Sequence, residues 1–571
     1  MDARVPQAVT EEQPTFAELF TPKLITILRE GYGLRGFRAD VLAGLTVAIV
    51  ALPLSMAIAI ASGTTPDRGL YTAIIGGFFI SALGGSRFQV GGPAGAFIVL
   101  VAAAVARHGI EGVVLATMMS GVILLAMGFL RLGSYVKFMP YPVTVGFTAG
   151  IGVIIFASQV KDFFGLTLGA AEPGALLPKL AALATAAPTV NAAAVAMSVL
   201  TVGMILGLRR FWPRAPGMLL GVGLAALLVA AFQLPVETIG TRFGGIPHGL
   251  PMPALPPITL EKMIAVLPDA IAFAVLGAIE ALLSAVVADG MTGRRHRSNC
   301  ELVGQGVANI ASGLFGGICA TGTIARTATN VRSGAHGPIA GILHALFILG
   351  FMLVAAPLAS YIPLAALAGV LTVVAWNMIE RHAIATLART SLGDSAVLAV
   401  TFLLTIFRDL SEGIVVGFGL GTLLFLHRMT QATRIELHLP DILEDKADTS
   451  NGGRTQYDST MATNRDVMVY RLNGAFFFGT ASTLGAILER IADSPKTFIL
   501  DFAAVPFLDS TGANIIVGLA KNAQRSDTKL VISGASTATR TMLEGHDPQG
   551  TQLTFADSIA EALTRWAPRP A

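Results

Sequence analysis

The sequence predicts an α-helical membrane protein of about fourteen transmembrane segments in a 7+7 inverted repeat, followed by a small α/β domain. Three observations carry this prediction: the composition, the long charge-free runs, and an abrupt change to polar sequence after Arg434. The 571 residues are 53% hydrophobic and 13% charged, with a mean hydropathy of +0.68, whereas soluble domains carry about 25% charged residues. A membrane protein accounts for this deficit of charge.

The same composition excludes several classes of protein. A formal net charge of +3 is too small to indicate a nucleic-acid partner. Both cysteines, Cys300 and Cys319, lie beside apolar runs, so we expect no disulfide framework, no metal cluster and no cofactor. Residues 1–38 are polar, with a modestly amphipathic stretch at Phe16–Leu28, and lack the apolar core and cleavage site of a secretory signal. We therefore expect the N-terminal segment to stay in the cytoplasm.

Long runs without charged residues occupy most of the chain up to about Arg428. A membrane-spanning helix needs about 20 apolar residues, and the run Ser333–Ile379 is long enough for two. Glycine, proline and charged residues divide this region into segments. The predicted segments are Val41–Ala61, Leu70–Leu83, Ala94–Ala106, Gly112–Leu130, Ser134–Ala157, Asn191–Leu208, Met218–Leu234, Met263–Ala288, Leu302–Phe315, Ile324–Val331, Pro338–Pro357, Leu364–Met378, Ala396–Phe407 and Gly413–His427.

The connections between these segments predict the orientation. With the N-terminus inside, the inward connections carry twelve basic and four acidic residues, whereas the outward connections carry seven basic and eight acidic residues. The positive-inside rule selects this arrangement, and an even number of spans leaves both termini in the cytoplasm. We therefore expect a multi-pass protein of the cell inner membrane.

Two short segments, the third and the tenth, each follow a glycine-rich run. Residues 84–96 read GGSRFQVGGPAGA and residues 316–327 read GGICATGTIART. Broken helices survive in a bilayer only where protein or a cavity satisfies the backbone, and interrupted segments in corresponding halves indicate a transporter's binding site. Their positions fit two inverted seven-segment repeats, whose half-helix amides would meet near the midplane and bind an anion. The alternative is that both runs are glycine-rich packing contacts between helices.

Two ionisable residues, Glu280 and Arg326, are expected deep in the membrane. Glu280 lies eleven residues after Asp269 and nine before Asp289, which at about 1.5 Å per residue places it roughly mid-bilayer. Ser284 is one turn further along the same helix face, and Arg326 lies in the first turn of the tenth segment. Charges at such depth are costly and are functional candidates. The alternative is a Glu280–Arg326 ion pair that merely holds two helices together.

At these motifs the sequence resembles the SulP family of sulfate permeases, from about Asp40 to the end of the chain. The resemblance rests on Ala51-Leu52-Pro53, the turn Gly91-Gly92-Pro93-Ala94, NCELVGQGVAN at Asn299–Asn309 and TGTIARTATN at Thr321–Asn330. It implies a fourteen-span fold with core and gate domains, elevator-like movement and a homodimer. It also implies an anion site between the third and tenth helices.

The resemblance implies roles for particular residues. Glu280 matches a carboxylate on the eighth helix that is associated with proton or cation coupling, and Ser284 shares its helix face. The positions that match the substrate site are Pro93, Ala94 and Gly95 at one half-helix and Thr323, Ile324, Ala325 and Arg326 at the other.

The sequence departs from the family pattern at two of these places. Many members have Gln after the first-helix proline, where this chain has Leu54, and many have Ser where it has Ala325. Both departures remove a polar group from the expected site. Leu54 and VVAWNMIE at Val373–Glu380 resemble the bacterial dicarboxylate-transporting branch, whereas bicarbonate transporters of cyanobacteria share much of the eighth and ninth segments.

After the membrane region, residues 466–567 alternate between strand and helix patterns. We expect strands at Val467–Arg471, Thr497–Phe502 and Lys529–Ser533. With Asp509-Ser510-Thr511-Gly512 after a strand, this region resembles a STAS domain, in which the resemblance implies phosphorylation at the position of Ser510. The simpler interpretation is an ordinary helix N-cap without regulation. The expected helices lie near Ala481–Ala492, Ala513–Asn522 and Ser558–Thr564.

The predicted organisation is a cytoplasmic segment at 1–38, an anion-transport domain at 39–434, a linker at 435–465 and a STAS domain at 466–567. We expect a non-enzymatic secondary active transporter, driven by protons, that takes up sulfate or a C4-dicarboxylate. A sodium-coupled bicarbonate transporter and a membrane-anchored STAS signalling module are alternatives. A nucleobase transporter, which would be expected to lack the C-terminal domain, and an uncoupled anion channel are further rivals.

Overall fold

The structure is a computed structural model that divides the chain into two compact units, Met1–Gly419 and Leu420–Ala571. It describes residues 15–134, 140–169, 172–173, 175–212, 215–408, 410–432, 434–437, 467–475, 496–525, 528–547 and 553–566. The expected helix at 481–492 and most of the expected linker lie outside these described residues.

The first unit is helical, apart from two very short strands. By length and apolar composition, eight of the described helices can cross a membrane, the last of them in α19, which continues into the second unit, and α10 and α18 are shorter apolar helices. The number of fourteen spans stays a prediction. The helices are α1 (Phe16–Phe20), α2 (Lys23–Gly31), α3 (Leu34–Ala61), α4 (Pro66–Tyr71), α5 (Gly77–Leu83), α6 (Ile98–Phe129), α7 (Tyr141–Phe164), α8 (Leu176–Ala186), α9 (Ala192–Phe211), α10 (Gly217–Phe232), α11 (Ile239–Phe243), α12 (Leu260–Thr292), α13 (Ser298–Leu314), α14 (Ile324–Arg332), α15 (Ile339–Ala359), α16 (Leu364–Met378), α17 (Arg381–Thr390), α18 (Leu392–Phe407) and α19 (Leu410–Ala432).

Every predicted segment overlaps a helix, but several boundaries differ. The second segment begins earlier, at Pro66, and a single π-helical turn at Thr72–Gly76 joins α4 to α5. The third and fourth segments form one helical stretch, α6, which is broken only at Gly109, where φ is 67° and ψ is −176°. The fifth segment was placed too early, because α7 starts after Pro140, and proline favours the first turn of a helix.

Within the predicted transmembrane region, three described helices were not predicted as segments: α8, α11 and α17. They are short, and α17 carries an amphipathic rather than a continuous apolar pattern. A membrane-spanning helix needs about 20 apolar residues, so a search for such runs does not detect helices this short.

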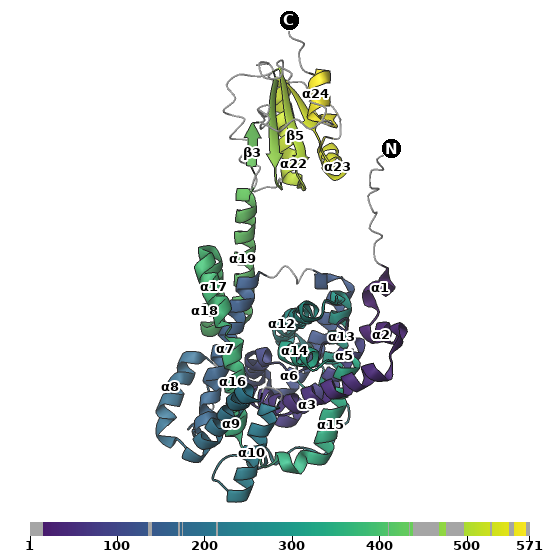
Figure 1. Ribbon diagram of the computed structural model, residues 1–571. Coiled ribbons are helices and arrows are strands. Elements are labelled where there is room, and N and C mark those ends of the chain that lie inside the picture. The colour runs from purple at the N-terminus through teal and green to yellow at the C-terminus, as the bar shows by residue number, and fades with distance from the viewer. Residues whose placement is uncertain are drawn as a thin grey trace. The chain divides into compact units, whose positions relative to one another are not determined.

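The helices of the first unit fall into two groups by their contacts (Figure 1). We name α3–α6 and α12–α15 the core bundle, in which α6 packs against α12 and α13, and α3 against α15. We name α7, α9, α10, α16 and α18 the gate bundle, in which α7 packs against α16 and α18. A methyl group on Gly121 would lie 2.6 Å from the Gly306 carbonyl oxygen, so α6 and α13 pack backbone to backbone, as small residues allow in membranes.

The N-terminal helix α2 is attached to the end of the core bundle where α13 begins. The Arg297 guanidinium donates to the Thr21 carbonyl at 2.7 Å and to the Thr26 hydroxyl at 2.9 Å. Glu30 forms an ion pair with Arg87 in the glycine-rich run. This hydrogen-bonded ion pair lowers the pKa of Glu30 below its ordinary value.

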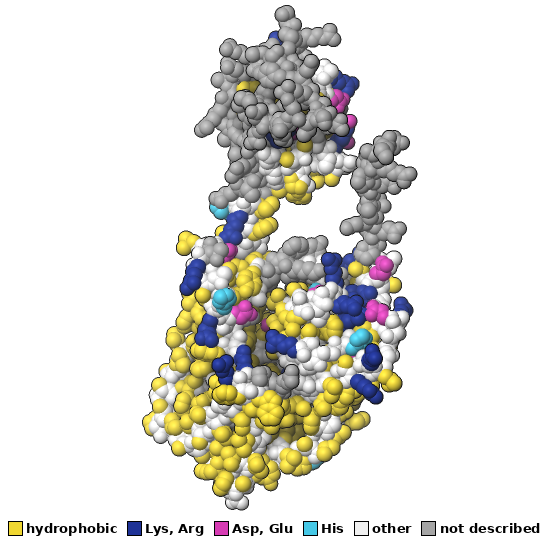
Figure 2. All heavy atoms as spheres, in the orientation of Figure 1, with side chains coloured by type: hydrophobic (Ala, Val, Ile, Leu, Met, Phe, Trp, Pro, Cys, Tyr) yellow, Lys and Arg dark blue, Asp and Glu magenta, His cyan; other side chains and the backbone are white. Residues whose placement is uncertain are grey.

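The surface of this unit has the distribution expected of a membrane protein. Apolar side chains cover much of the visible face, and Lys, Arg, Asp and Glu gather toward one end of it (Figure 2). Exposed apolar residues of this kind include Leu227, Phe232 and Val354. An apolar surface of such extent is stable in contact with lipid rather than water.

The second unit contains a five-stranded sheet in the order β3-β4-β5-β6-β7. Only the β3–β4 pair is antiparallel; the other three pairs are parallel. The strands are β3 (Arg434–Leu437), β4 (Val467–Asn473), β5 (Thr497–Ala504), β6 (Lys529–Ser533) and β7 (Thr554–Ala556), and the helices are α22 (Ser510–Arg525), α23 (Thr537–His546) and α24 (Ile559–Trp566).

Side chains alternate between the two faces of β5, the central strand of this sheet. Phe498 and Leu500 belong to a buried cluster with Ile516 of α22, whereas Ile499 packs with Ala562 of α24. The three expected strands, and the two expected helices within the described residues, are therefore confirmed as β4, β5, β6, α22 and α24. The strands β3 and β7 and the helix α23 were not predicted, and β3 begins in the stretch expected to be linker.

Candidate functional site

The two glycine-rich runs meet inside the core bundle as a pair of short strands. β1 (Gly91–Gly92) pairs antiparallel with β2 (Thr321–Gly322), so that Gly91 lies opposite Gly322. β1 leads through a 3-10 turn at Gly95–Phe97 into α6, and β2 leads into α14. Because the strands are antiparallel, the two helices leave the pair in opposite directions, with both N-termini directed toward it. The predicted extended runs are present, and α14 is short as predicted, whereas the other short segment continues past Gly109 as part of the long helix α6.

The start of each helix faces the gate bundle or an open space. A methyl group on Gly95 would lie 3.6 Å from Met378 Sδ and 3.7 Å from Ile155 Cδ1, which belong to α16 and α7. Ile324 and Ala325 are exposed, whereas Ala94 and Thr323 are buried. The first amides of a helix have no partner within it and carry its positive dipole end. The start of α6 therefore offers hydrogen-bond donors toward the gate bundle, and the start of α14 offers them beside the exposed Ile324 and Ala325.

Arg326 lies behind the strand pair, almost fully buried at 2% exposure. Its guanidinium donates to the Gly91 carbonyl at 3.2 Å, the Pro93 carbonyl at 3.2 Å and the Ser55 hydroxyl at 3.1 Å. Its Nε, also buried, has no hydrogen-bond partner among the residues that the structure describes. A positive charge with an unused donor is thus fixed next to both helix starts.

The close approach of Arg326 depends on a glycine in β1. Gly92 has a φ of +152°, a conformation that side chains other than glycine rarely adopt. A methyl group there would overlap Arg326 Nη1. Gly92 therefore provides both the backbone shape and the space for the guanidinium.

Glu280 lies elsewhere, on the side of α12 that faces α7. It lines a small cavity together with Thr144, Phe147 and Thr148 of α7 and Ile414 of α19. Between Glu280 and Arg326, both within the described part of the chain, there is no ion pair. The interpretation of these two residues as a structural ion pair is therefore not supported by the geometry.

Ser284 points in a different direction from Glu280, although it lies one turn away on α12. It is fully buried and donates to the Thr327 hydroxyl of α14 at 2.9 Å. Thr327 Oγ1 in turn accepts from the Val90 amide at 3.2 Å. Ser284 thus supports the strand pair and does not line the Glu280 cavity.

Comparison with known proteins identifies the family. The model of the sulfate permease family matches residues 37–401, and the STAS domain model matches residues 458–562. YvdB of Bacillus subtilis, named provisionally as a sulfate transporter, is 40% identical over 90% of this chain and 94% of its own length. The chain belongs to the sulfate permease family.

Other members of the family are similar to this permease over most of their length. The bicarbonate transporter BicA of Picosynechococcus is 31% identical over 89% of this chain and 91% of its own. The solved transmembrane domain of a cyanobacterial BicA has a TM-score of 0.60 at 34% identity, covering 67% of the permease and 98% of that chain. Murine Slc26a9, solved in an inward-facing state, has a TM-score of 0.81 at 18% identity over 98% and 96% of the two chains. It shares the fold.

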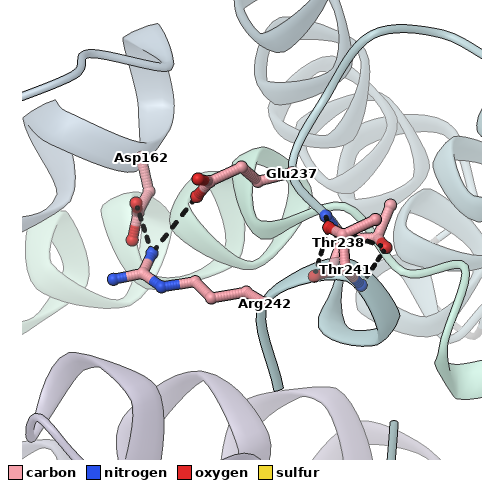
Figure 3. A network of polar contacts seen from close by, with 5 residues as sticks. All are labelled: Asp162, Glu237, Thr238, Thr241 and Arg242. Carbon is pink, nitrogen blue, oxygen red and sulfur yellow. Dashed lines mark hydrogen bonds and ion pairs between the residues drawn. The ribbon is translucent and has the colours of Figure 1, made fainter. Parts of the chain in front are cut away.

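The permease also has a cavity of about 640 Å³ between the core and gate bundles, along the start of α6 and the end of α7. Arg107, Lys161, Lys179 and Arg242 line it. Arg242 Nη1 lies 3.3 Å from Asp162 Oδ1 and 3.5 Å from Glu237 Oε2 (Figure 3). Beside it, Thr238 and Thr241 cap α11 reciprocally, so this network ties the end of α7 to the segment before α11.

In the STAS domain, Ser510 lies beside the residue that caps α22. The N-cap of α22 is Asp509, whose Oδ1 accepts from the Gly512 amide at 2.7 Å. Ser510 is the first residue of the helix and is exposed, with its hydroxyl 3.8 Å from Met542 Sδ. Ser510 is therefore accessible and is not required for capping.

Sequence reasoning missed Ser55 and Thr327, which join the strand pair to α3 and α12. Each is a buried hydroxyl in an apolar stretch of helix or next to a motif. A hydroxyl in such a place could have been predicted to bond to another helix, because polar groups in membrane helices form hydrogen bonds across helices. Pro93 contributes its carbonyl to Arg326 rather than a side-chain contact.

Proposed function

We propose that the permease is a proton-coupled secondary transporter that takes up a divalent anion, sulfate or a C4-dicarboxylate, across the inner membrane. The observation that carries the proposal is the meeting of two helix N-termini beside the buried guanidinium of Arg326. In this proposal Pro93, Ala94, Gly95, Thr323, Ile324, Ala325 and Arg326 form the substrate site. Both termini are cytoplasmic, and the permease acts as a homodimer.

The charge of this site favours a dianion. Each helix N-terminus is equivalent to roughly half a positive charge, and Arg326 adds one full charge. The site therefore presents about two positive charges, which sulfate or a dicarboxylate neutralises. Where little water is present, the attraction between the site and an ion of opposite charge is stronger than in bulk solvent, because the dielectric constant is lower.

Glu280 provides the coupling in this proposal. It is without a hydrogen-bond or ion-pair partner among the described residues, and it lies at the boundary between the bundles. When Glu280 carries a proton, the core bundle keeps its full positive charge and binds the dianion. Loss of that proton on the cytoplasmic side places a negative charge in the same bundle and favours release of the anion.

The position of the site suits movement of one bundle against the other. All proposed substrate residues and Glu280 belong to the core bundle, whereas Ile155, Met378 and Thr148, which face them, belong to the gate bundle. Sliding of the core bundle would carry anion and proton together past a fixed gate. Rigid movement of one packed unit is the usual basis of alternating access.

A sodium-coupled bicarbonate transporter is the second candidate. The similarity to BicA favours it, together with the apolar Leu54 and Ala325 at the expected site. A bicarbonate ion carries one charge, so it fits the site when Glu280 is ionised and one positive charge is offset. The two candidates thus differ in the state of Glu280 during binding.

Uptake into proteoliposomes tests the proposal. The purified permease is reconstituted and given radiolabelled sulfate, succinate, fumarate or bicarbonate, first with an inward proton gradient and then with an inward sodium gradient. Proton-driven accumulation of sulfate or a dicarboxylate supports the proposal. Sodium-driven accumulation of bicarbonate selects the second candidate, and absence of all uptake favours a signalling role for the STAS domain.

A further inference from the structure

A large cavity lies within the gate bundle, away from the strand pair. It is a groove of about 1250 Å³ between α7, α9, α16 and α17. Its deep wall is apolar and includes Phe156, Val202 and Val373, and its mouth carries Arg209 and Arg381. We propose that this groove binds an anionic phospholipid of the cytoplasmic leaflet, with the acyl chain along the wall and the phosphate between the two arginines.

The groove has the length that a lipid chain requires. Tyr141 and Phe156, both lining residues, are fifteen positions apart on α7, which corresponds to about 22 Å along the helix. The hydrocarbon of one leaflet is about 15 Å thick, half of a typical bilayer core. The wall therefore extends through one leaflet, and the exposed Phe156 and Leu206 present apolar surface along it.

The two arginines at the mouth are held in place by neutral partners. Arg209 Nη1 lies 3.3 Å from Asn377 Oδ1, and the Arg381 guanidinium stacks over the Trp376 ring at 4.6 Å. No ion pair among the described residues joins either of them to a carboxylate. By contrast, Arg107 and Arg242 at the other cavity are paired with acids. Glu380 also lines the groove, and no ion pair among the described residues joins it to either arginine. Two arginines and one carboxylate leave the mouth with a net positive charge that a phosphate group can neutralise.

The place of the groove and its lining residues both favour an anionic lipid of the cytoplasmic leaflet. The proposed orientation places the end of α9 and the start of α17 at the cytoplasmic side, where basic pockets between membrane helices recognise anionic headgroups. Trp376 and Tyr141 also line the groove, and such aromatic residues prefer the depth of the headgroups. A bound lipid would link α17 to α9 and so brace the gate bundle.

Lipid binding to the full-length permease, measured by native mass spectrometry after delipidation, tests the inference. Phosphatidylglycerol is compared with phosphatidylcholine of the same acyl chains. Two basic contacts predict a preference of about thirtyfold for phosphatidylglycerol, equivalent to about 2 kcal/mol at 1.4 kcal/mol per tenfold. Equal binding of the two lipids to the wild-type permease would overturn the inference.

Matched variants locate the site. The double variant R209Q/R381Q is expected to lose most of the preference and still bind phosphatidylcholine, which also checks that the groove is folded. The control R210Q/R389Q removes two exposed arginines from the same helices outside the groove and is expected to keep the preference. Equal loss in both double variants would mean a general charge effect and would contradict the proposal.

A third variant tests the apolar wall. Leu206→Trp fills the groove and leaves both arginines in place, so binding of both lipids at this site is expected to fall. Unchanged lipid binding by this variant would exclude an acyl chain in the groove. These measurements require no transport, so their failure is distinguishable from failure of the proposed function.

Discussion

Arg326 of α14 donates a hydrogen bond to the hydroxyl of Ser55 in α3, with 3.1 Å between Nη2 and Oγ. The same guanidinium bonds to the carbonyls of Gly91 and Pro93. A single buried cation therefore connects both glycine-rich runs to the first long helix. Its charge lies beside the helix N-termini, and no described ion pair neutralises it.

Replacement of this cation should weaken anion binding. Arg326→Gln removes one of about two positive charges of the proposed site and is expected to raise the KM for a divalent anion at least tenfold. Arg332→Gln, in the last turn of α14, is the matched control and should leave the KM unchanged. Uptake kinetics in proteoliposomes measure both variants. An unaltered KM in Arg326→Gln, with normal protein yield, would rule out its role in the site.

Removal of the ionisable group at Glu280 should separate coupling from exchange. Glu280→Gln mimics the protonated carboxyl, so the anion still binds but no proton is released. We expect loss of proton-driven accumulation, whereas anion exchange down a gradient retains a substantial rate. Glu261→Gln, in the exposed first turn of the same helix, serves as the control. Full accumulation by Glu280→Gln would show that another group carries the proton.

Gly92 should be intolerant of any side chain. Gly92→Ala places a methyl group on the Arg326 guanidinium and forces an unfavourable φ, which costs about 1–3 kcal/mol from backbone strain alone. We expect a clear drop in the thermal unfolding midpoint in detergent. Gly223→Ala is the control, because its methyl group meets open space within α10. Equal midpoints for the two variants would contradict this account of the strand pair.

The ion pair between Glu30 and Arg87 predicts a pH dependence of α2 attachment. The pKa of Glu30 is lower in the folded state, so its contribution is present above the ordinary value near 4.5 and is lost as pH falls through the folded pKa. Hydrogen exchange of residues 23–31, corrected for intrinsic rates, should be faster in Glu30→Gln than in wild type at pH 7. That difference should close at lower pH and be absent in an Arg87→Gln background. A difference that persists at low pH would argue against the ion pair.

Asp509, rather than Ser510, should stabilise the start of α22. Asp509→Ala removes the side chain that caps the Gly512 amide. Loss of such a cap typically lowers helix stability by about 1 kcal/mol, which raises the local opening equilibrium roughly fivefold. Ser510→Ala should change hydrogen exchange in the first turn of α22 by much less. Both variants are measured in the full chain by mass spectrometry. A larger effect of Ser510→Ala would assign the serine a structural role.

Much of the architecture was predictable because it depends on local patterns. Apolar runs with glycine, proline and charge between them indicated each helical segment, including the short α14. The glycine-rich runs around Gly91 and Gly322 indicated that two helices are interrupted, because a break of this kind in a membrane requires other protein groups to satisfy its backbone. Their pairing as antiparallel strands was not predicted. The helices α8 and α17 were not predicted, because α8 is too short to span a membrane and the apolar residues of α17 cover only one face.

The sequence by itself determined that this chain crosses a membrane, that two glycine-rich runs interrupt its helices, and that Glu280 and Arg326 lie among apolar residues. Only the tertiary structure decided their partners. Arg326 bonds to Ser55 and two carbonyls, while Glu280 faces α7 and Ser284 bonds to Thr327. The partner of a side chain depends on how each helix is rotated about its axis. Packing against several helices that are distant in the sequence sets that rotation. The spacing of residues along one helix does not predict it.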